Sequence, residues 1–373
     1  MTNLRLFLSC TLVFLVACGA DSALLAQNNP FTVTELARFD EPWAMTFLPD
    51  GRLLVTEKAG NLKLYNLDSD AMGEISGVPE TRDAGQGGFG DIVLHPDYAS
   101  NSLVYMSYRE EGRGGSGTAV ARARLVLSGD SGSLEDVDVI WRQVPKMGGN
   151  GHYGQRIAFH DGYLWISSGE RQQFDPAQDM SMNLGKILRL NDNGSVPSDN
   201  PFADQGGVAA EVWSLGHRNP LGLAFDSNGQ LWNVEMGPRG GDELNRVVRG
   251  GNYGYPIVSN GNHYSGADIP DHDTRPEFNE PAAFWNPVIS PSSLMFYSGS
   301  EFPAWQGNAF IGGLSSESLV RIEFNGDQAR EVERYGMDNR IREVEQGPDG
   351  AIYVLEDGSG RSGGKLLRLE AGE

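Results

Sequence analysis

Cysteine is almost absent from this sequence. The 373 residues include two cysteines, Cys10 and Cys18, and both lie close to the N-terminus. The chain after Cys18 carries no thiol, so the folded part can hold neither a disulfide nor a cysteine-ligated metal. A haem-attachment motif of the type Cys-x-x-Cys-His is absent as well.

Positive charge is also scarce. The chain has 29 lysines and arginines against 50 aspartates and glutamates, a formal net charge of -21. Proteins that bind nucleic acid present a basic face, so this balance argues against a nucleic-acid partner. It is typical of a solvated exterior, with calcium as a possible counter-ion.

Long helices are the third absence. No window shows a sustained helical period of apolar residues, whereas glycine and proline are frequent, at 49 and 19 residues. Aromatic residues make up 9% of the chain. Such a composition favours many short strands joined by tight turns.

The N-terminus has the pattern of an export signal. Arg5 is followed by an apolar run, Leu6 to Val16, that is too short to span a membrane. The run ends in Leu15-Val16-Ala17-Cys18-Gly19, which resembles the bacterial lipobox. We expect residues 1–17 to be a lipoprotein signal peptide, and 18–30 to be a lipidated Cys18 and a tether. The protein would then be exported and anchored to a bacterial membrane, facing the periplasm or the cell surface. An ordinary signal cleaved nearer Ala26 is the alternative.

From Phe31 onward a strand–turn–strand pattern recurs six times, at intervals of roughly 45–70 residues. Repeats of this kind are typical of blades that stack radially around a channel. We therefore predict that residues 31–373 form an all-β, six-bladed β-propeller of four-stranded antiparallel blades, with an array of β-sandwiches as the alternative. Such a disc buries its core without a partner, so a monomer is expected. The copies are Trp43–Phe47 with Leu53–Thr56, Gly90–Leu94 with Leu103–Tyr108, Arg156–Phe159 with Tyr163–Ser167, Gly222–Phe225 with Gln230–Val234, Ser293–Tyr297 with Ala309–Gly312, and Ile341–Glu345 with Ala351–Leu355.

The third copy carries the strongest chemical signal. His152 lies nine residues before the turn residue Asp161, and Glu170 lies nine after it. In an antiparallel pair these positions face each other across the open end of the hairpin. A histidine held beside a carboxylate can act as a general base with an orienting partner.

Further residues, most of them polar, are expected on the same face of the disc, because they stand at the ends of the paired strands of other copies. Three arginines gathered there would repel one another unless an anionic ligand were present. The residues are Gln86, Arg218, Asn219, Pro238, Arg340 and Arg342.

Six motifs in this order and spacing carry a resemblance over residues 31–370. They are GQGGFGDIVLHPDY, NGHYGQR, GHRNPLGLAF, EMGPRGGDEL, GGNYGYP and RIREVEQGPDG. The chain resembles the soluble aldose sugar dehydrogenases dependent on pyrroloquinoline quinone, in the glucose/sorbosone dehydrogenase family. This resemblance implies a six-bladed propeller, in agreement with the repeats.

The resemblance also implies roles for the residues on this face. His152 matches the general base, and Glu170 matches the acid that orients it. Arg218 and Asn219 match cofactor contacts, the arginine being placed to stabilise charge on the reduced quinone. Gln86 matches a further contact, and the two arginines Arg340 and Arg342 match the pair that binds the cofactor carboxylates.

Calcium is implied in the same way. The carbonyls of Gly237 and Pro238 match those that hold a calcium ion between protein and quinone. Glu243 and the carbonyl of Tyr253 match a second, structural calcium site. A glycine-rich turn with surface carboxylates remains the alternative.

One position departs from the family pattern. Ser315, or a residue beside it, stands where the family usually has a lysine directed at the cofactor, so one cation of several is lost. Tyr264 is expected to line the cofactor pocket, and the loops 111–118 and 259–283 are expected to border the substrate.

Three functions fit these observations. The first is a dehydrogenase that oxidises an aldose at its anomeric carbon to the lactone and passes electrons to an external acceptor. The second is a calcium-dependent propeller lactonase, which would have little use for Arg340 and Arg342. The third is a surface lipoprotein that binds glycans or protein, which would not require the pairing of His152 with Glu170.

Overall fold

The structure, a computed structural model, describes residues 29–360 and 362–372. The predicted signal peptide and the lipidated Cys18 therefore lie outside the described residues, as does most of the tether. Within the described residues no helix is long and apolar enough to cross a membrane. The regular structure of the described residues is almost entirely β, with one four-residue α-helix, α1 (Tyr98–Asn101), and short 3-10 turns.

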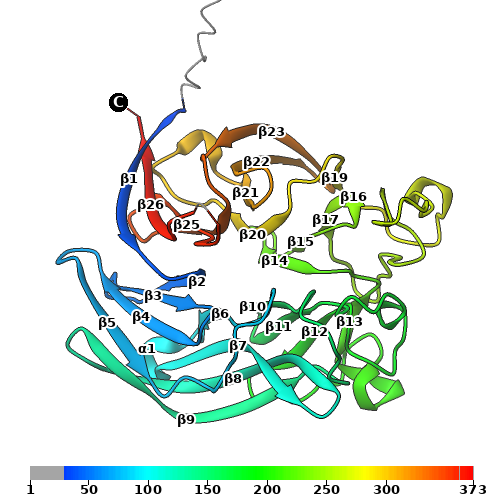
Figure 1. The fold of residues 1–373 in the computed structure, drawn as a ribbon, viewed down its shortest axis with the longest axis horizontal. Helices are drawn as coiled ribbons and strands as arrows, with labels where there is room; N and C mark the ends of the chain where they lie inside the picture. Colours follow the sequence, from blue (N-terminus) through cyan, green and yellow to red (C-terminus); the bar gives the residue numbers. More distant parts are fainter. Residues whose placement is uncertain (1–28, 361, 373) are drawn as a thin grey trace, which may run out of the picture.

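The strands in residues 29–360 and 362–372 form four four-stranded sheets, one eight-stranded sheet and one two-stranded ribbon. The sheets are arranged around a common centre, as in a propeller (Figure 1). This arrangement confirms the predicted all-β, propeller-like class.

The eight-stranded sheet comprises β2 (Pro42–Phe47), β3 (Leu53–Glu57), β4 (Asn61–Asn66), β5 (Ala71–Ser76), β9 (Ser131–Arg142), β8 (Gly115–Ser128), β7 (Leu103–Gly112) and β6 (Phe89–Leu94), in that order. The next two sheets are β10 (Gly154–His160), β11 (Tyr163–Ser168), β12 (Lys186–Asn191) and β13 (Val212–Leu215), and then β14 (Pro220–Phe225), β15 (Leu231–Glu235), β17 (Asp242–Arg246) and β19 (Ala283–Trp285).

The last two four-stranded sheets are β20 (Pro291–Phe296), β21 (Ala309–Gly313), β22 (Ser318–Asn325) and β23 (Gln328–Gly336), and then β24 (Ile341–Gln346), β25 (Ile352–Glu356), β26 (Lys365–Ala371) and β1 (Phe31–Arg38). The ribbon pairs β16 (Arg239–Gly240) with β18 (Gly261–Asn262). In the eight-stranded sheet, β5 and β9 pair in parallel through two residues each, so two antiparallel runs of four strands meet edge to edge. β1 pairs antiparallel with β26, so strands from opposite ends of the chain share the last sheet.

Each of the six predicted hairpins is present, with ends that differ from the prediction by a few residues. The first strand of every hairpin, β2, β6, β10, β14, β20 or β24, lies at the centre and contacts the first strands on either side. Each of these six strands also has a register shift near its start. A bulge of this kind bends the strand and redirects the side chain of the unpaired residue.

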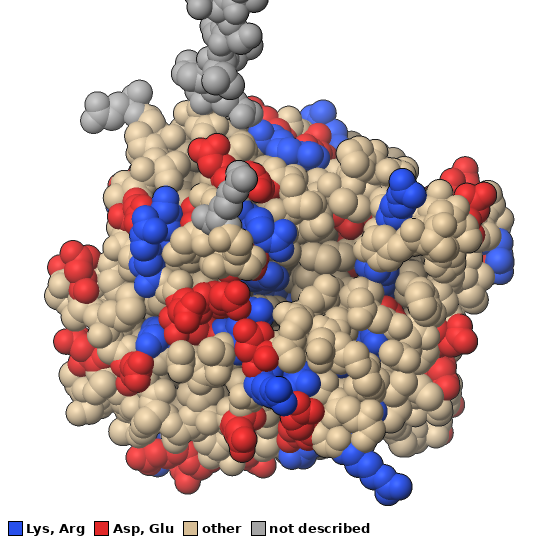
Figure 2. Space-filling view, viewed as in Figure 1, with Lys and Arg blue, Asp and Glu red and all other residues tan. Residues whose placement is uncertain are grey.

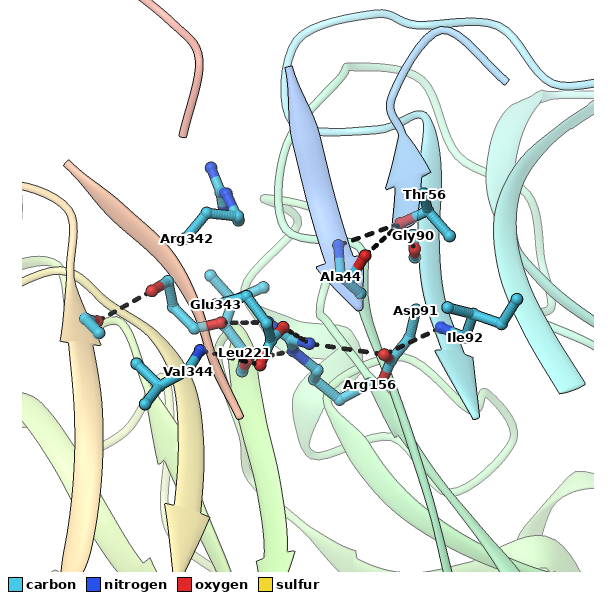
Figure 3. Close-up of polar contacts among 12 residues, drawn as sticks. Ala44, Thr56, Gly90, Asp91, Ile92, Arg156, Leu221, Arg342, Glu343 and Val344 are labelled. Carbon is cyan, nitrogen blue, oxygen red and sulfur yellow. Dashed lines mark hydrogen bonds and ion pairs between the residues drawn. The ribbon is translucent and has the colours of Figure 1, made fainter. Parts of the chain in front are cut away.

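Arg156, one of the unpaired residues of β10, joins the central strands. Its Nε donates to the carbonyl oxygen of Leu221 at 2.7 Å, and its Nη2 donates to that of Ser292 at 2.6 Å. Its Nη1 pairs with Glu343 and lies 3.5 Å from Asp91 Oδ1 (Figure 3). One buried guanidinium therefore connects β10 to β6, β14, β20 and β24.

Candidate active site

His152 and Glu170 lie where the hairpin geometry places them. His152 precedes β10 and Glu170 follows β11, and His152 Nδ1 is hydrogen-bonded to Glu170 Oε1. The other oxygen of Glu170 accepts hydrogen bonds from the backbone N–H groups of Gln173 and Phe174. Gln86 Oε1 accepts a hydrogen bond of 2.7 Å from the backbone N–H of His152. Since Nδ1 of His152 is hydrogen-bonded to Glu170, Nε2 is the ring nitrogen that can accept a proton from a substrate.

Burial shapes the acid–base behaviour of this pair. Glu170 is fully buried and His152 is buried but lines a cavity. Burial lowers the pKa of His152; the bond to Glu170 opposes this, and the positive charge of Arg218 adds to the lowering. The imidazole is therefore neutral at pH 7, the state that a general base needs.

The backbone around the pair is held in uncommon conformations. His152 has φ of 51°, and Arg171, Gln172 and Phe174 have φ values of 61°, 59° and 64°. Such residues persist only where surrounding structure enforces them, and they cluster at functional sites. Arg171 supplies part of this support, because its buried guanidinium donates to Gly149 and Gly151 carbonyls. The sequence alone did not identify Arg171.

Two adjoining cavities open on this face. The first, which we call the arginine cavity, has a volume of about 430 Å³, and the second, the histidine cavity, has a volume of about 600 Å³. They share Gln86, Met236 and Ser290. The arginine cavity is also lined by Glu41, Trp43, Lys58, Gly85, Tyr153, Gly154, Gln155, Asn219, Leu221, Leu314, Arg340, Arg342, Asp357 and Ser359.

The bulges of the central strands explain the floor of the arginine cavity. Trp43, Gln155, Leu221 and Arg342 each fall at a register shift, and each lines this cavity. The hairpin pattern predicts the strands but not these shifts, so Trp43 and Gln155 were missed as candidate site residues. In Figure 2, basic side chains lie in the hollow near the middle of the face, and acidic side chains are spread over the surface around it.

Arg340 and Arg342 lie together as predicted, but the charge argument used for them was incomplete. Asp357 accepts from Arg340 Nε and from Arg342 Nε, each at 2.8 Å. Burial tends to raise the pKa of Asp357, yet Arg342, Ser359 and Arg340 together hold it well below its usual range. Asp357 thus relieves the repulsion that was expected to need a ligand. The terminal nitrogens of Arg340 form no hydrogen bond within the described residues, and they remain able to bind one.

Arg218 and Asn219 lie on the strand-entry loop before β14. Arg218 Nη1 donates to the carbonyl oxygens of Gly237 at 2.6 Å and Met236 at 3.0 Å, and the side chain lines the histidine cavity. Asn219 Oδ1 accepts from the backbone N–H of Gly154 at 3.2 Å, and Asn219 lines the arginine cavity. The two residues therefore contribute to different cavities.

A second histidine–glutamate pair stands beside Arg218. His217 Nδ1 lies 2.8 Å from Glu235 Oε1, with the same separation of 18 residues as His152 and Glu170. The sequence pattern predicts that these two segments face each other, but it did not predict the pairing of His217 with Glu235. His217 is fully buried and its Nε2 bonds Ser214 Oγ at 2.8 Å, so both ring nitrogens are occupied. We conclude that His217 supports the loop, whereas His152 keeps a nitrogen for the cavity.

Gly237 and Pro238, the first predicted calcium ligands, line the histidine cavity. The carbonyl oxygens of Gly241 and Gly240 crowd Gly237, where a Cβ would meet them at 2.2 and 2.4 Å. Calcium prefers oxygen ligands of this kind. The Gly237 carbonyl oxygen already accepts from Arg218, so a calcium ion there would share that oxygen or displace the arginine.

Glu243 and Tyr253, the second predicted calcium ligands, lie apart from both cavities in a buried polar cluster. Burial and the nearby charge of Glu235 raise the pKa of Glu243 well above its usual value. Asn245 Oδ1 is buried without a hydrogen-bond partner. The carbonyl oxygen of Tyr253 lies 3.1 Å from His272 Nε2. The raised pKa of this buried carboxyl and the unpaired amide oxygen of Asn245 fit a calcium ion, although the described residues hold no group of three or more His, Cys, Asp or Glu suited to a metal.

The family model for glucose / sorbosone dehydrogenases matches residues 39–368. The chain belongs to this family. It is 40% identical to the aldose sugar dehydrogenase YliI of Escherichia coli over 357 residues, 93% of this chain and 95% of that protein. It is 26% identical to quinoprotein glucose dehydrogenase B of Acinetobacter calcoaceticus over 411 residues, 87% and 85% of the two chains.

Solved structures of the glucose/sorbosone dehydrogenase family share the fold. The apo form of the soluble E. coli aldose sugar dehydrogenase has a TM-score of 0.85 at 39% identity, covering 92% of this chain and all of that one. The PQQ-bound aldose sugar dehydrogenase of Streptomyces coelicolor has a TM-score of 0.74 at 28% identity, covering 91% and 98%. The resemblance to the soluble, quinone-dependent aldose sugar dehydrogenases is thereby confirmed.

Of the remaining predicted site residues and loops, some line the histidine cavity and others do not. Tyr264 is 73% exposed and lines the histidine cavity, with its ring centre 5.8 Å from the Arg218 guanidinium. Ser315 is exposed and lines neither cavity, although the preceding Leu314 does. The loop 259–283 borders the histidine cavity through Asn262, Tyr264 and Gly266, whereas no residue of the loop 111–118 lines either cavity.

Proposed function

We propose that this protein is a pyrroloquinoline quinone-dependent aldose sugar dehydrogenase, which oxidises an aldose at its anomeric carbon to the lactone. The observation that carries the proposal is the buried His152–Glu170 pair, which presents a neutral imidazole to a cavity adjoining one with three basic side chains, Lys58, Arg340 and Arg342. Family membership and the quinone-dependent relatives support the same reaction.

His152 supplies the proton transfer. Its Nε2 takes the proton of the anomeric hydroxyl, while Glu170 fixes the ring orientation through Nδ1 and stabilises the imidazolium that forms. When bound, pyrroloquinoline quinone supplies the acceptor for the hydride that leaves the anomeric carbon. Arg218 lines the histidine cavity, and its guanidinium would stabilise negative charge that develops during this transfer. The electrons then pass to an external acceptor.

The arginine cavity is proposed to hold the cofactor. Arg340 and Arg342 would bind its carboxylates, and Gln86 and Asn219 would contact its ring system. Lys58 lines the same cavity and is 3.2 Å from both Glu41 and Asp83. Lys58 would supply a positive charge toward the cofactor in place of the lysine that the family usually has at the position of Ser315. Tyr264 would border the cofactor from the histidine cavity.

Calcium is proposed at two positions. The carbonyls of Gly237 and Pro238 would hold the ion next to the cofactor, where it would polarise the reacting carbonyl. Glu243 and the Tyr253 carbonyl would hold the second ion in the buried cluster, where it would balance the carboxylate.

We further propose that the fold is a six-bladed propeller of four-stranded blades, in which the eight-stranded sheet is two blades joined by β5 and β9. The protein would act as a monomer, exported and anchored through Cys18. Cys18→Ala should abolish lipid labelling of the chain, and retained labelling would contradict the anchor.

The test of the reaction is dye reduction by the purified protein with calcium, pyrroloquinoline quinone and a panel of aldoses. We expect turnover that needs the sugar and the quinone and that collapses in His152→Ala. A protein that binds the quinone but oxidises no aldose would contradict the substrate class, and one that does not bind the quinone would contradict the proposal as a whole.

A further inference from the structure

Exposed aromatic side chains line the histidine cavity and a cavity that adjoins it. Among the described residues the large aromatic side chains with most exposure are Tyr264 at 73%, Phe284 at 54% and Phe174 at 45%. Tyr264 lines the histidine cavity. Phe174 follows Glu170 closely in sequence and packs edge-on against His263, 5.9 Å between ring centres. Exposed aromatic rings at the mouth of a site commonly mark a binding surface.

Phe284 belongs to a third cavity, of about 510 Å³, which we call the amide cavity. It is formed by the loop 260–271 and by the segment around β19. It shares Asn262 and Asn286 with the histidine cavity, so the two cavities adjoin. Its lining residues are Asn260, Gly261, Asn262, Asp268, Ile269, Pro270, Asp271, Phe284 and Asn286.

The lining of the amide cavity has the chemistry of a site for a neutral polyol. Side-chain amides offer both donors and acceptors, and carboxylates accept from hydroxyl groups. The side chains of Asp268, Asp271 and Asn286 form no hydrogen bond within the described residues, so their polar atoms are available. Two carboxylates without a lysine or arginine in the lining disfavour an anionic ligand. Phe284 offers a ring face for the C–H groups of a sugar.

We propose that the amide cavity is a subsite for the second sugar residue of a reducing oligosaccharide, an inference that rests on the proposed function. Oxidation at the anomeric carbon requires the reducing-end residue to lie at His152. The next residue of the oligosaccharide is attached on the far side of that sugar, so it must extend out of the histidine cavity. The amide cavity adjoins the histidine cavity at Asn262 and Asn286, so a sugar residue that extends past these two side chains reaches Phe284.

The experiment compares glucose with maltose and cellobiose in the holoenzyme, reading KM and kcat separately. Phe284→Ala should raise KM for at least one disaccharide by about tenfold, the loss expected for an aromatic contact, and leave KM for glucose and all kcat values unchanged. Asp268→Ala is the second variant and should act in the same direction. Val137→Ala removes an exposed apolar side chain from β9 and is the matched control.

A binding measurement separates this inference from the proposed function. Methyl maltoside and methyl cellobioside, which cannot be oxidised at the anomeric carbon, should bind by calorimetry and lose affinity in Phe284→Ala. If no aldose is oxidised but this binding loss is seen, the reaction is wrong and the sugar subsite stands. If Phe284→Ala affects glucose and disaccharides equally, or affects neither in turnover and binding, the subsite is wrong.

Discussion

The guanidinium carbon of Arg156 lies 4.2 Å from the centre of the Trp43 ring. Trp43 lines the arginine cavity, so the cation that connects the central strands also supports the floor of the proposed cofactor site. The stability of the central strands and the shape of the arginine cavity therefore both depend on the side chain of Arg156.

Arg156→Met should destabilise the protein by about 3–5 kcal/mol, because it leaves the buried carboxylates of Asp91 and Glu343 without their counter-ion. Burial already raises the pKa of Glu343 to about 7. Denaturant unfolding measures the loss. Adding Glu343→Gln should recover part of it, whereas Arg330→Met, at an exposed arginine, should change little. Equal stabilities of the Arg156 and Arg330 variants would contradict this interpretation.

The pH dependence of turnover should report His152. Burial lowers the pKa of this histidine below its ordinary value of 6.5, so the acid limb of kcat/KM should lie below pH 6.5 and activity should be level above it. Glu170→Gln removes a bond that raises this pKa, so the limb should move to lower pH while kcat falls about 10²-fold or more.

His217→Gln is the matched control for the histidine prediction. It disturbs the other pair with the same 18-residue spacing. It should lower the thermal unfolding temperature and leave the position of the acid limb unchanged. If the acid limb shifts in this variant, the titration does not belong to His152 alone, and the assignment is wrong.

Cofactor affinity should depend on Arg340. Its terminal nitrogens are not engaged within the described residues, and its side chain is 38% exposed. Arg340→Ala should weaken quinone binding about tenfold, measured by quenching of tryptophan fluorescence, and added salt should weaken the wild type more than the variant. Arg330→Ala again serves as the control. Unchanged affinity would place the carboxylates of the cofactor elsewhere.

Calcium should stabilise the protein through Glu243. Without the ion the pKa of Glu243 is raised, so the folded state holds its proton more tightly than the unfolded state, and stability falls as the pH rises above 4.5 toward the raised pKa. Calcium binds the ionised form, so the thermal shift on adding calcium should grow with pH. Glu243→Gln should lose this shift, and Glu277→Gln, at an exposed carboxylate, should keep it. The same shift in both variants would place the ion elsewhere.

The hairpins and the His152–Glu170 pair were predictable because strand pairing follows local patterns of apolar residues and turns. The bulges that direct Trp43 and Gln155 to the cavity were not, since a register shift depends on the neighbouring sheets. Asp357 was missed for a related reason. It faces Arg340 and Arg342 only after β24 and β25 pair, and no local pattern marks it as their partner.

The pairing of β1 with β26 has a consequence for how the ring can be assembled. Strands from opposite ends of the chain lie side by side, with Phe31 opposite Ala371. A short linker could join them, and new termini could be cut at the exposed turn residues Asp161 and Gly162. We expect this circular permutant to fold and keep its quinone affinity. In the permutant, β10 and β11 would be the terminal strands, and their pairing would close the ring in place of the pairing of β1 with β26. Failure to fold, with a linker long enough to span the ends, would show that the ring must be closed by β1.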